Sequence, residues 1–166
     1  QKAMFNIGGY GESEKTLLKL IKQLGLEKQV KLLGRISDEA RNKLYASSWA
    51  AVQPSSFEGW GITTIEANTF ATPVIASNVN GLRDSVIDGK TGLLVPPRDI
   101  KELASAMEKI VTDRKLRVKL SSGAELWSHK FRWSKSSKVF MDIFKKELIK
   151  SAGETNKEKV LAYLKK

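Results

Sequence analysis

The sequence predicts an α/β fold in which a parallel sheet of about five strands carries helices on both faces. Short apolar runs alternate with stretches of helical periodicity, and glycine or proline ends most of the runs. A length of 166 residues with 41% hydrophobic content fits one domain-sized globular unit. A unit of this size buries roughly 70% of the surface of its unfolded chain.

Each strand is expected where a short apolar run ends at a turn residue. The five runs are Ala3–Ile7, Val30–Leu33, Trp49–Gln53, Pro73–Ala76 and Leu93–Val95. Helices are expected over residues 14–24, from Ser37 onward, and over residues 61–70, 81–87, 100–112, 113–128, 134–150 and 157–165. Ser37 is the expected N-cap of the second helix, and Gly25 is the expected stop of the first.

The chain is expected to comprise a domain over residues 1–150 and a basic C-terminal helix or tail over residues 151–166, with a hinge at Gly153–Asn156. From Lys130 to Lys166 eleven basic residues stand against four acidic ones, which places +7 of the net charge of +11 in this part. A basic surface attracts phosphates, anionic lipid headgroups or nucleic acid. A solvated, lysine-rich helix face is an equally weighted interpretation.

The composition excludes several classes of site. Disulfides and thiolate metal sites are excluded because the chain has no cysteine, and its single histidine, His129, makes a zinc site unexpected. No apolar run approaches the roughly 20 residues that span a bilayer, and no signal peptide is recognisable. We therefore expect a cytoplasmic domain, with peripheral association with the inner membrane face as the alternative.

The loops that follow the strands carry the candidate binding residues. Ligands of parallel α/β sheets bind at the carboxyl ends of the strands. Glu58 and Glu66 flank a glycine-rich loop that leads into a helix, whose free N–H groups and dipole attract anions. Carboxylates also accept hydrogen bonds from sugar hydroxyls. The combination favours a ligand with both phosphate and hydroxyl groups, such as a nucleotide-sugar.

The aromatic residues divide into two groups. Trp60 lies between glycines beside a carboxylate and is expected to serve the site. Packing roles are expected for Trp49, Trp127, Phe131 and Trp133.

Several motifs occur in the order of a known family. They are Pro54–Ile62, Ile65–Ala67, Thr72–Ser77, Gly81–Leu82 and Asp88–Val95, with Gly8–Glu12, Val30–Gly34 and Phe131–Trp133 as flanking signatures. Up to about residue 150 the chain resembles the C-terminal, donor-binding half of the retaining group 1 (family four) glycosyltransferases, which have the GT-B fold. The resemblance implies a Rossmann-like domain that lacks the family's first strand-helix unit.

The resemblance also implies an activity, a hexosyl-type transfer from a nucleoside-diphosphate-sugar to an acceptor hydroxyl with retained anomeric configuration. This chain would be the donor-binding half, inactive alone. The implied partners are a nucleotide-sugar donor, an N-terminal acceptor-binding domain, and a lipid-linked acceptor or anionic membrane surface. No cofactor, metal or nucleic acid is expected.

The resemblance assigns roles to matching residues. Glu58 is similar to the glutamate that contacts the donor sugar near the reaction centre and is the catalytic candidate, and Glu66 is similar to the glutamate that binds the ribose hydroxyls. Thr63 begins the helix that faces the diphosphate. Backbone contacts to sugar and diphosphate are implied for Gly59, Trp60, Gly61 and Ile62. The nucleotide loops are implied to contain Gly9, Gly11, Gly34, Arg35 and Ile36; Arg35 is weighed equally as an exposed loop residue.

The chain departs from the family pattern at a few positions. Asn68 and Ala71 stand where the family usually has Met and Gly, and the helix is expected to tolerate both. Asn80 and Asp84 replace a usual Gly and Glu.

Three alternatives to the transferase interpretation remain. The chain could be a non-catalytic module that binds nucleotide-sugars or a membrane surface. It could be a GT-B epimerase or phosphorylase relative. It could also be a non-catalytic partner subunit.

Overall fold

A computed structural model describes residues 3–152, 156, 158 and 160–162. The chain divides into two compact units, Gln1–Leu126 and Trp127–Lys166. The domain boundary that the sequence predicts after residue 150 lies inside the second unit. Much of the predicted hinge and of the predicted last helix lies outside the described residues.

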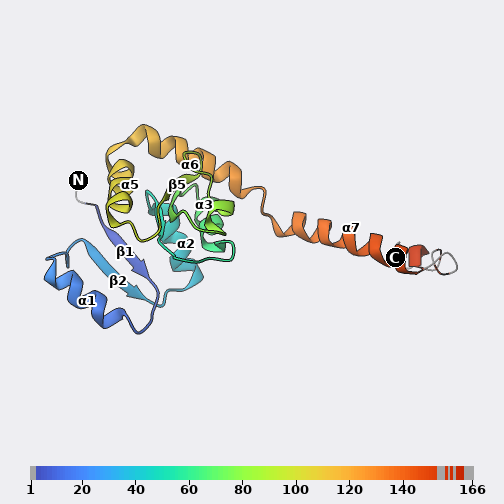
Figure 1. Ribbon diagram of the computed structural model, residues 1–166, viewed down its shortest axis with the longest axis horizontal. Helices are drawn as coiled ribbons and strands as arrows, with labels where there is room; N and C mark the ends of the chain where they lie inside the picture. Colours follow the sequence, from blue (N-terminus) through green and yellow to red (C-terminus); the bar gives the residue numbers. More distant parts are fainter. Residues whose placement is uncertain (1–2, 153–155, 157, 159, 163–166) are drawn as a thin grey trace. The chain divides into compact units, whose positions relative to one another are not determined.

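The strands and helices alternate in the predicted order (Figure 1). The strands are β1 (Phe5–Gly8), β2 (Val30–Gly34), β3 (Ala51–Gln53), β4 (Val74–Ser77) and β5 (Gly92–Val95). The helices are α1 (Glu14–Gln23), α2 (Asp38–Ser47), α3 (Ile62–Thr69), α4 (Leu82–Ser85), α5 (Ile100–Thr112), α6 (Arg114–Ser128) and α7 (Trp133–Ser151).

The predicted helix ends correspond to real caps. The Ser37 hydroxyl accepts a hydrogen bond from the Ala40 N–H at 3.2 Å, which satisfies one of the free N–H groups of α2. Gly25 follows α1 with a φ of 64°, a left-handed conformation that glycine adopts without steric cost.

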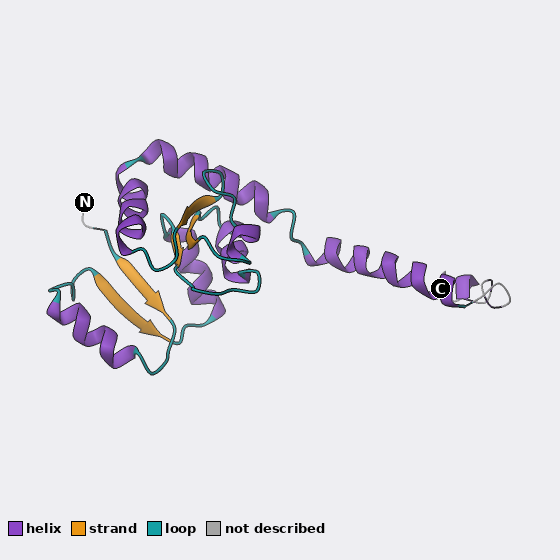
Figure 2. Cartoon of the chain, viewed as in Figure 1, coloured by secondary structure: helices purple, strands orange, loops and turns teal. Residues whose placement is uncertain are grey.

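All strand pairs are parallel, which confirms the predicted α/β class, but the five strands lie in two sheets (Figure 2). β1 pairs with β2, and β3, β4 and β5 pair in that order. Within the described residues, β4 is the strand that pairs on both edges, and all four of its residues are buried. No residue of β1 or β3, both fully described, is buried.

The core lies on the two faces of the three-stranded sheet. On one face Val74 and Ala76 of β4 pack with Ala67 of α3 and Leu82 of α4. On the other face Ile75 packs with residues of α5 and α6, namely Ala106, Ile110 and Leu120. The alternation along β4 therefore places helices on both faces of this sheet.

The second unit contains the long helix α7. Trp127 and Phe131 pack edge to face, with ring centroids 5.0 Å apart, as the sequence predicts. The packing role predicted for Trp133 is wrong, because its side chain is 90% exposed. Among the helices that the structure describes, none has the length and apolar character needed to cross a membrane.

Candidate functional site

The loop after β3 holds Glu58 in a defined position. Gln53, the last residue of β3, donates from Nε2 to the Ser55 hydroxyl at 2.9 Å and to Glu58 Oε1 at 3.1 Å. Glu58 is partly buried, and its neighbour Phe57 is exposed. A hydrogen bond from the Gln53 side-chain amide thus holds the Glu58 carboxylate at the end of β3.

Gly81, before α4, lies close against the backbone of the same loop. A Cβ at Gly81 would overlap the carbonyl oxygen of Glu58 and lie 2.7 Å from that of Gly59. The φ of Gly81 is 81°, which a residue with a side chain rarely adopts. Only glycine therefore lets the Glu58–Gly59 backbone approach α4 so closely.

The start of α3 is open to solvent at its first two residues. Gly61 is buried with a φ of 77°, and a Cβ there would lie 2.7 Å from Leu82 Cδ2. Thr64 secures the turn, because its hydroxyl donates to the Gly61 carbonyl at 2.7 Å. Ile62 and Thr63 are exposed. The N–H groups of a first helical turn lack partners within the helix, so this turn can accept an anion.

Glu66 lies one turn along α3 from Ile62, on the side of the helix away from the core. Arg41 of α2 reaches it, with 3.4 Å between Arg41 Nη2 and Glu66 Oε1, and the two side chains are each 34% exposed. Asp38 holds the same guanidinium at 3.0 Å through Nη1. Asp38 therefore holds the Arg41 guanidinium, and Arg41 in turn orients the Glu66 carboxylate.

Burial and the charges of this ion pair shift the pKa of Tyr45 in α2. Burial raises the pKa of the Tyr45 phenol, the Glu66 carboxylate raises it further, and the Arg41 guanidinium lowers it. Tyr45 packs against the core cluster of α3 and β4, and its carbonyl accepts from the Thr72 hydroxyl at 2.6 Å. α2 is thereby attached to α3 and β4 beside Glu66.

The loops after β1 and β2 form a second group of predicted residues. The Gly9 N–H donates to the Gly34 carbonyl at 2.9 Å. A Cβ at Gly8 would lie 2.9 Å from Ile36 Cδ1, so the two loops are in close contact. Arg35 stacks on the Tyr10 ring, with its guanidinium carbon 4.3 Å from the ring centroid, and donates to the Tyr10 hydroxyl. Gly11 lies at the turn into α1, where its carbonyl accepts from the Glu14 N–H at 3.2 Å.

The predicted residues thus fall into two groups, and α2 connects them. One group comprises the loops of Gly9 and Gly34–Ile36, and the other comprises Glu58–Thr63 and Glu66. α2 begins at Asp38, two residues after Ile36, and contacts Glu66 through Arg41.

Sequence reasoning missed Arg41, Gln53 and Tyr10. Gln53 could have been found as a polar residue at the carboxyl end of a strand, and Tyr10 as an aromatic residue in a glycine-rich loop. Arg41 carries no such signal, because its role depends on how α2 packs against α3.

The described residues contain no group of three or more His, Cys, Asp or Glu side chains that could hold a metal ion.

Comparison with known proteins identifies the relatives of this chain. Residues 1–127 match the family model described as "Glycosyl transferases group 1". An alpha-D-kanosaminyltransferase of Streptomyces kanamyceticus is 35% identical over 120 residues, which are 72% of this chain and 31% of that protein. A D-inositol 3-phosphate glycosyltransferase of Corynebacterium urealyticum is 28% identical over 134 residues, which are 81% of this chain and 32% of that protein.

A solved structure agrees with these relatives. Anabaena Alr3699/HepE in complex with UDP-glucose superposes with a TM-score of 0.70 at 28% identity, over 76% of this chain and 36% of that one. The chain spans about a third of the length of the curated relatives given above. The family match covers more than half of the chain. The chain therefore belongs to the group 1 glycosyltransferases and has the α/β architecture of their GT-B structures.

Proposed function

We propose that this chain is the donor-binding half of a glycosyltransferase that moves a hexose-type sugar from a nucleoside-diphosphate-sugar to an acceptor hydroxyl, with retention of anomeric configuration. The observation that carries the proposal is the open first turn of α3 between the Glu58 loop and Glu66. Ile62 and Thr63 are exposed, and the loop before them packs closely against Gly81. A diphosphate would bind the free N–H groups of this turn.

The carboxylates would bind the hydroxyls on either side of the diphosphate. Glu58, held by Gln53, would accept from the donor sugar near the reaction centre. Glu66, held by Arg41, would accept from the ribose hydroxyls. The loops of Gly9, Gly11 and Gly34–Ile36 would border the nucleobase, and the exposed Tyr10 ring offers an aromatic face beside Arg35. The UDP-glucose complex of HepE supports a donor of this class.

Donor binding would need no metal ion or other cofactor. Backbone N–H groups and the dipole of α3 would offset the negative charge of the bound diphosphate. The same groups would stabilise the charge that develops on the leaving diphosphate during transfer. We expect the affinity for the donor to stay unchanged when EDTA replaces added Mg²⁺ in a titration.

Transfer would require the rest of the protein. The whole relatives are about three times as long as the matched segment. We therefore expect this chain to bind a donor and to leave it intact, which a radiolabelled-sugar assay with candidate acceptors measures. We place the binding event in the cytoplasm.

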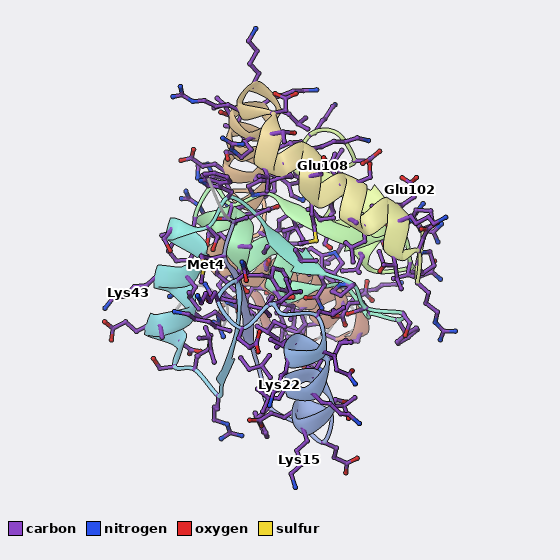
Figure 3. The ribbon with its side chains drawn as sticks, turned by 90° about the vertical axis from the view of Figure 1, so that its left-hand side faces the viewer. Met4, Lys15, Lys22, Lys43, Glu102 and Glu108 are labelled. Carbon is purple, nitrogen blue, oxygen red and sulfur yellow. The ribbon has the colours of Figure 1, made fainter. Side chains whose placement is uncertain are left out.

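Isothermal titration calorimetry with UDP-, GDP- and ADP-sugars tests the proposal. One of these donors should bind, and Glu66→Gln should weaken that binding by about tenfold, because a hydrogen bond to a charged group contributes about 1.5–3 kcal/mol. Glu39→Gln is the matched control and should leave affinity unchanged, since Glu39 is exposed and pairs with Lys43 of the same helix. The Lys43 side chain points outward from α2 (Figure 3). Absence of binding by all three donors, or an equal effect of both variants, would contradict the proposal.

A further inference from the structure

The Gln53 side-chain amide sets the direction of a small hydrogen-bond network beside the Glu58 loop. Its Nε2 atom lies 2.9 Å from the Ser55 hydroxyl oxygen and 3.1 Å from Glu58 Oε1. An ionised carboxylate only accepts hydrogen bonds, so the Gln53 atom that faces Glu58 is the amide nitrogen. That nitrogen cannot accept, so the Ser55 oxygen accepts the second hydrogen of the same group. Both hydrogens of the Gln53 amide are therefore used.

This direction leaves Ser55 as a donor without an acceptor. The Ser55 oxygen already accepts from Gln53, so the single hydroxyl hydrogen points elsewhere. Within the part of the chain that the structure describes, no group accepts from Ser55, and no group other than Gln53 donates to the Glu58 carboxylate. Both side chains are partly buried, just after the carboxyl end of β3. The network thus offers one free O–H donor beside a carboxylate with free acceptor sites.

A donor beside an acceptor is complementary to the hydroxyl groups of a sugar. Because Ser55 Oγ and Glu58 Oε1 bond to the same nitrogen, the two oxygens lie about 5 Å apart. Two neighbouring hydroxyls of a sugar ring fit this gap, since one can accept from Ser55 while the other donates to Glu58, each over about 2.7 Å. A phosphate oxygen fits less well, because it would accept from Ser55 but would be repelled by the carboxylate.

We propose that Ser55 is a further binding residue for the donor sugar, and that Gln53 is the positioning residue that orients Ser55 and Glu58 toward two neighbouring sugar hydroxyls. This role rests on the proposed function, because it adds a residue to the sugar half of the same site. The class of donor is a nucleotide-sugar with a free pair of neighbouring ring hydroxyls. The nucleoside diphosphate lacks these hydroxyls, so Ser55 and Gln53 strengthen binding of the donor and not of the nucleoside diphosphate.

Calorimetry with glucose donors and their nucleoside diphosphates tests this difference. UDP-, GDP- and ADP-glucose are titrated beside UDP, GDP and ADP. Ser55→Ala should weaken binding of the glucose donor by about fivefold, because one neutral hydrogen bond is lost, and should leave the affinity for the nucleoside diphosphate within about twofold. Ser55→Thr keeps a hydroxyl and should retain most of the donor affinity. Ser56→Ala is the matched control, since Ser56 is the exposed neighbour in the same loop, and both affinities should stay unchanged.

Gln53→Met tests the positioning role. Methionine fills a similar volume without an N–H donor, so the Ser55 hydroxyl and the Glu58 carboxylate lose their common partner. Donor affinity should fall by about tenfold, because a hydrogen bond to a charged group is lost, and the affinity for the nucleoside diphosphate should again stay unchanged. The loss in the double variant with Ser55→Ala should be smaller than the two single losses combined, since both variants act on the same sugar contact.

Donor analogues identify the two hydroxyls. Analogues of the glucose donor that each lack the hydroxyl at C2, C3, C4 or C6 are titrated into the variants. Removal of the hydroxyl that Ser55 contacts should cost the Ser55→Ala chain no further affinity. Removal of the neighbouring hydroxyl should cost the Glu58→Ala chain the least.

Two results would overturn the role of Ser55 and leave the proposed function standing. One is donor binding that Ser55→Ala leaves unchanged or weakens no more than it weakens binding of the nucleoside diphosphate. The other is a pair of hydroxyls, identified through Ser55 and Glu58, that are not neighbours on the ring. Absence of binding by all glucose donors and all three nucleoside diphosphates would overturn the proposed function together with the role of Ser55.

Discussion

At the residue scale, the environment of Glu66 is defined by one cation and one phenol. Arg41 contacts Glu66 at 3.4 Å and Asp38 at 3.0 Å, so its position is fixed from two sides. Burial and then the Glu66 carboxylate raise the pKa of Tyr45, which keeps the phenol neutral. The pKa of Tyr45 therefore reports the charge of Glu66.

We predict a stability effect of Tyr45 at high pH. Free tyrosine ionises near pH 10, so above that pH the unfolded chain loses a proton that folded Tyr45 still holds. Its contribution to stability is therefore present below about pH 10 and is lost as pH rises through the raised pKa. Tyr45→Phe should therefore reduce the fall in the free energy of unfolding at high pH, which urea denaturation at a series of pH values measures. Glu66→Gln should lower the Tyr45 pKa in a spectrophotometric titration, and an unchanged titration would contradict the assigned cause.

Ala71 provides a second prediction at this scale. Its φ of 55° is left-handed, and the family pattern usually has glycine here. Ala71→Gly should therefore raise the free energy of unfolding by about 1 kcal/mol. Ala104→Gly, at an exposed position inside α5, should lower it by about 0.5–1 kcal/mol. Chemical denaturation measures both, and two changes of the same sign would be inconsistent with strain at Ala71.

At the element scale, the Glu58 loop is held between β3 and α4. Gln53 binds its carboxylate, and Gly81 allows its backbone to approach α4. Gly81→Ala should move the loop, because its Cβ would overlap the Glu58 carbonyl. We predict that donor affinity falls by about tenfold or more, since small displacements of binding groups are costly.

Gly25→Ala is the control for that experiment. Gly25 has a φ of 64° but has open space at its Cβ position, so the substitution strains the backbone without touching the loop. It should reduce stability by about 1 kcal/mol and leave donor affinity unchanged. Equal losses of affinity in the two variants would show that backbone strain alone, and not loop displacement, weakens binding.

The elements themselves could largely be predicted from the sequence. α5 has the predicted bounds, and Ser37 and Gly25 mark real helix ends, because apolar period and cap chemistry are local properties. The motif residues of the candidate site were also recognisable. The contact of Arg41 with Glu66 was not, since it arises from packing between two helices far apart in sequence. The exposure of Trp133 was missed because a lone aromatic residue does not reveal whether its helix is covered.

At the scale of the whole molecule, the separation into two sheets explains which strands are buried. β4, with partners on both edges, is buried throughout, whereas β1 and β3 each pair on one edge among the described residues. The single parallel sheet that the sequence predicts is present as one two-stranded and one three-stranded sheet. In a parallel pair, alternate N–H groups point to opposite edges, so every second amide of β1 and β3 points away from its partner.

Hydrogen exchange should reveal these edges. The Ala51 N–H donates to the Pro73 carbonyl at 2.9 Å, and by alternation the Val52 N–H points to the other edge of β3. Val52 should therefore exchange faster than Ala51, and the amides of β4 should exchange slowest in the sheet. Equal protection of Ala51 and Val52 would contradict the unpaired edge.

The central claim is that a nucleoside-diphosphate-sugar binds at the first turn of α3, between Glu58 and Glu66. The most direct test follows backbone amide shifts by NMR while the donor that binds in calorimetry is titrated into the chain. We predict that the largest changes fall on Gly59–Thr63, with smaller ones at Gly9 and Gly34–Ile36 and none in α7. Changes that leave Gly59–Thr63 untouched would contradict the account.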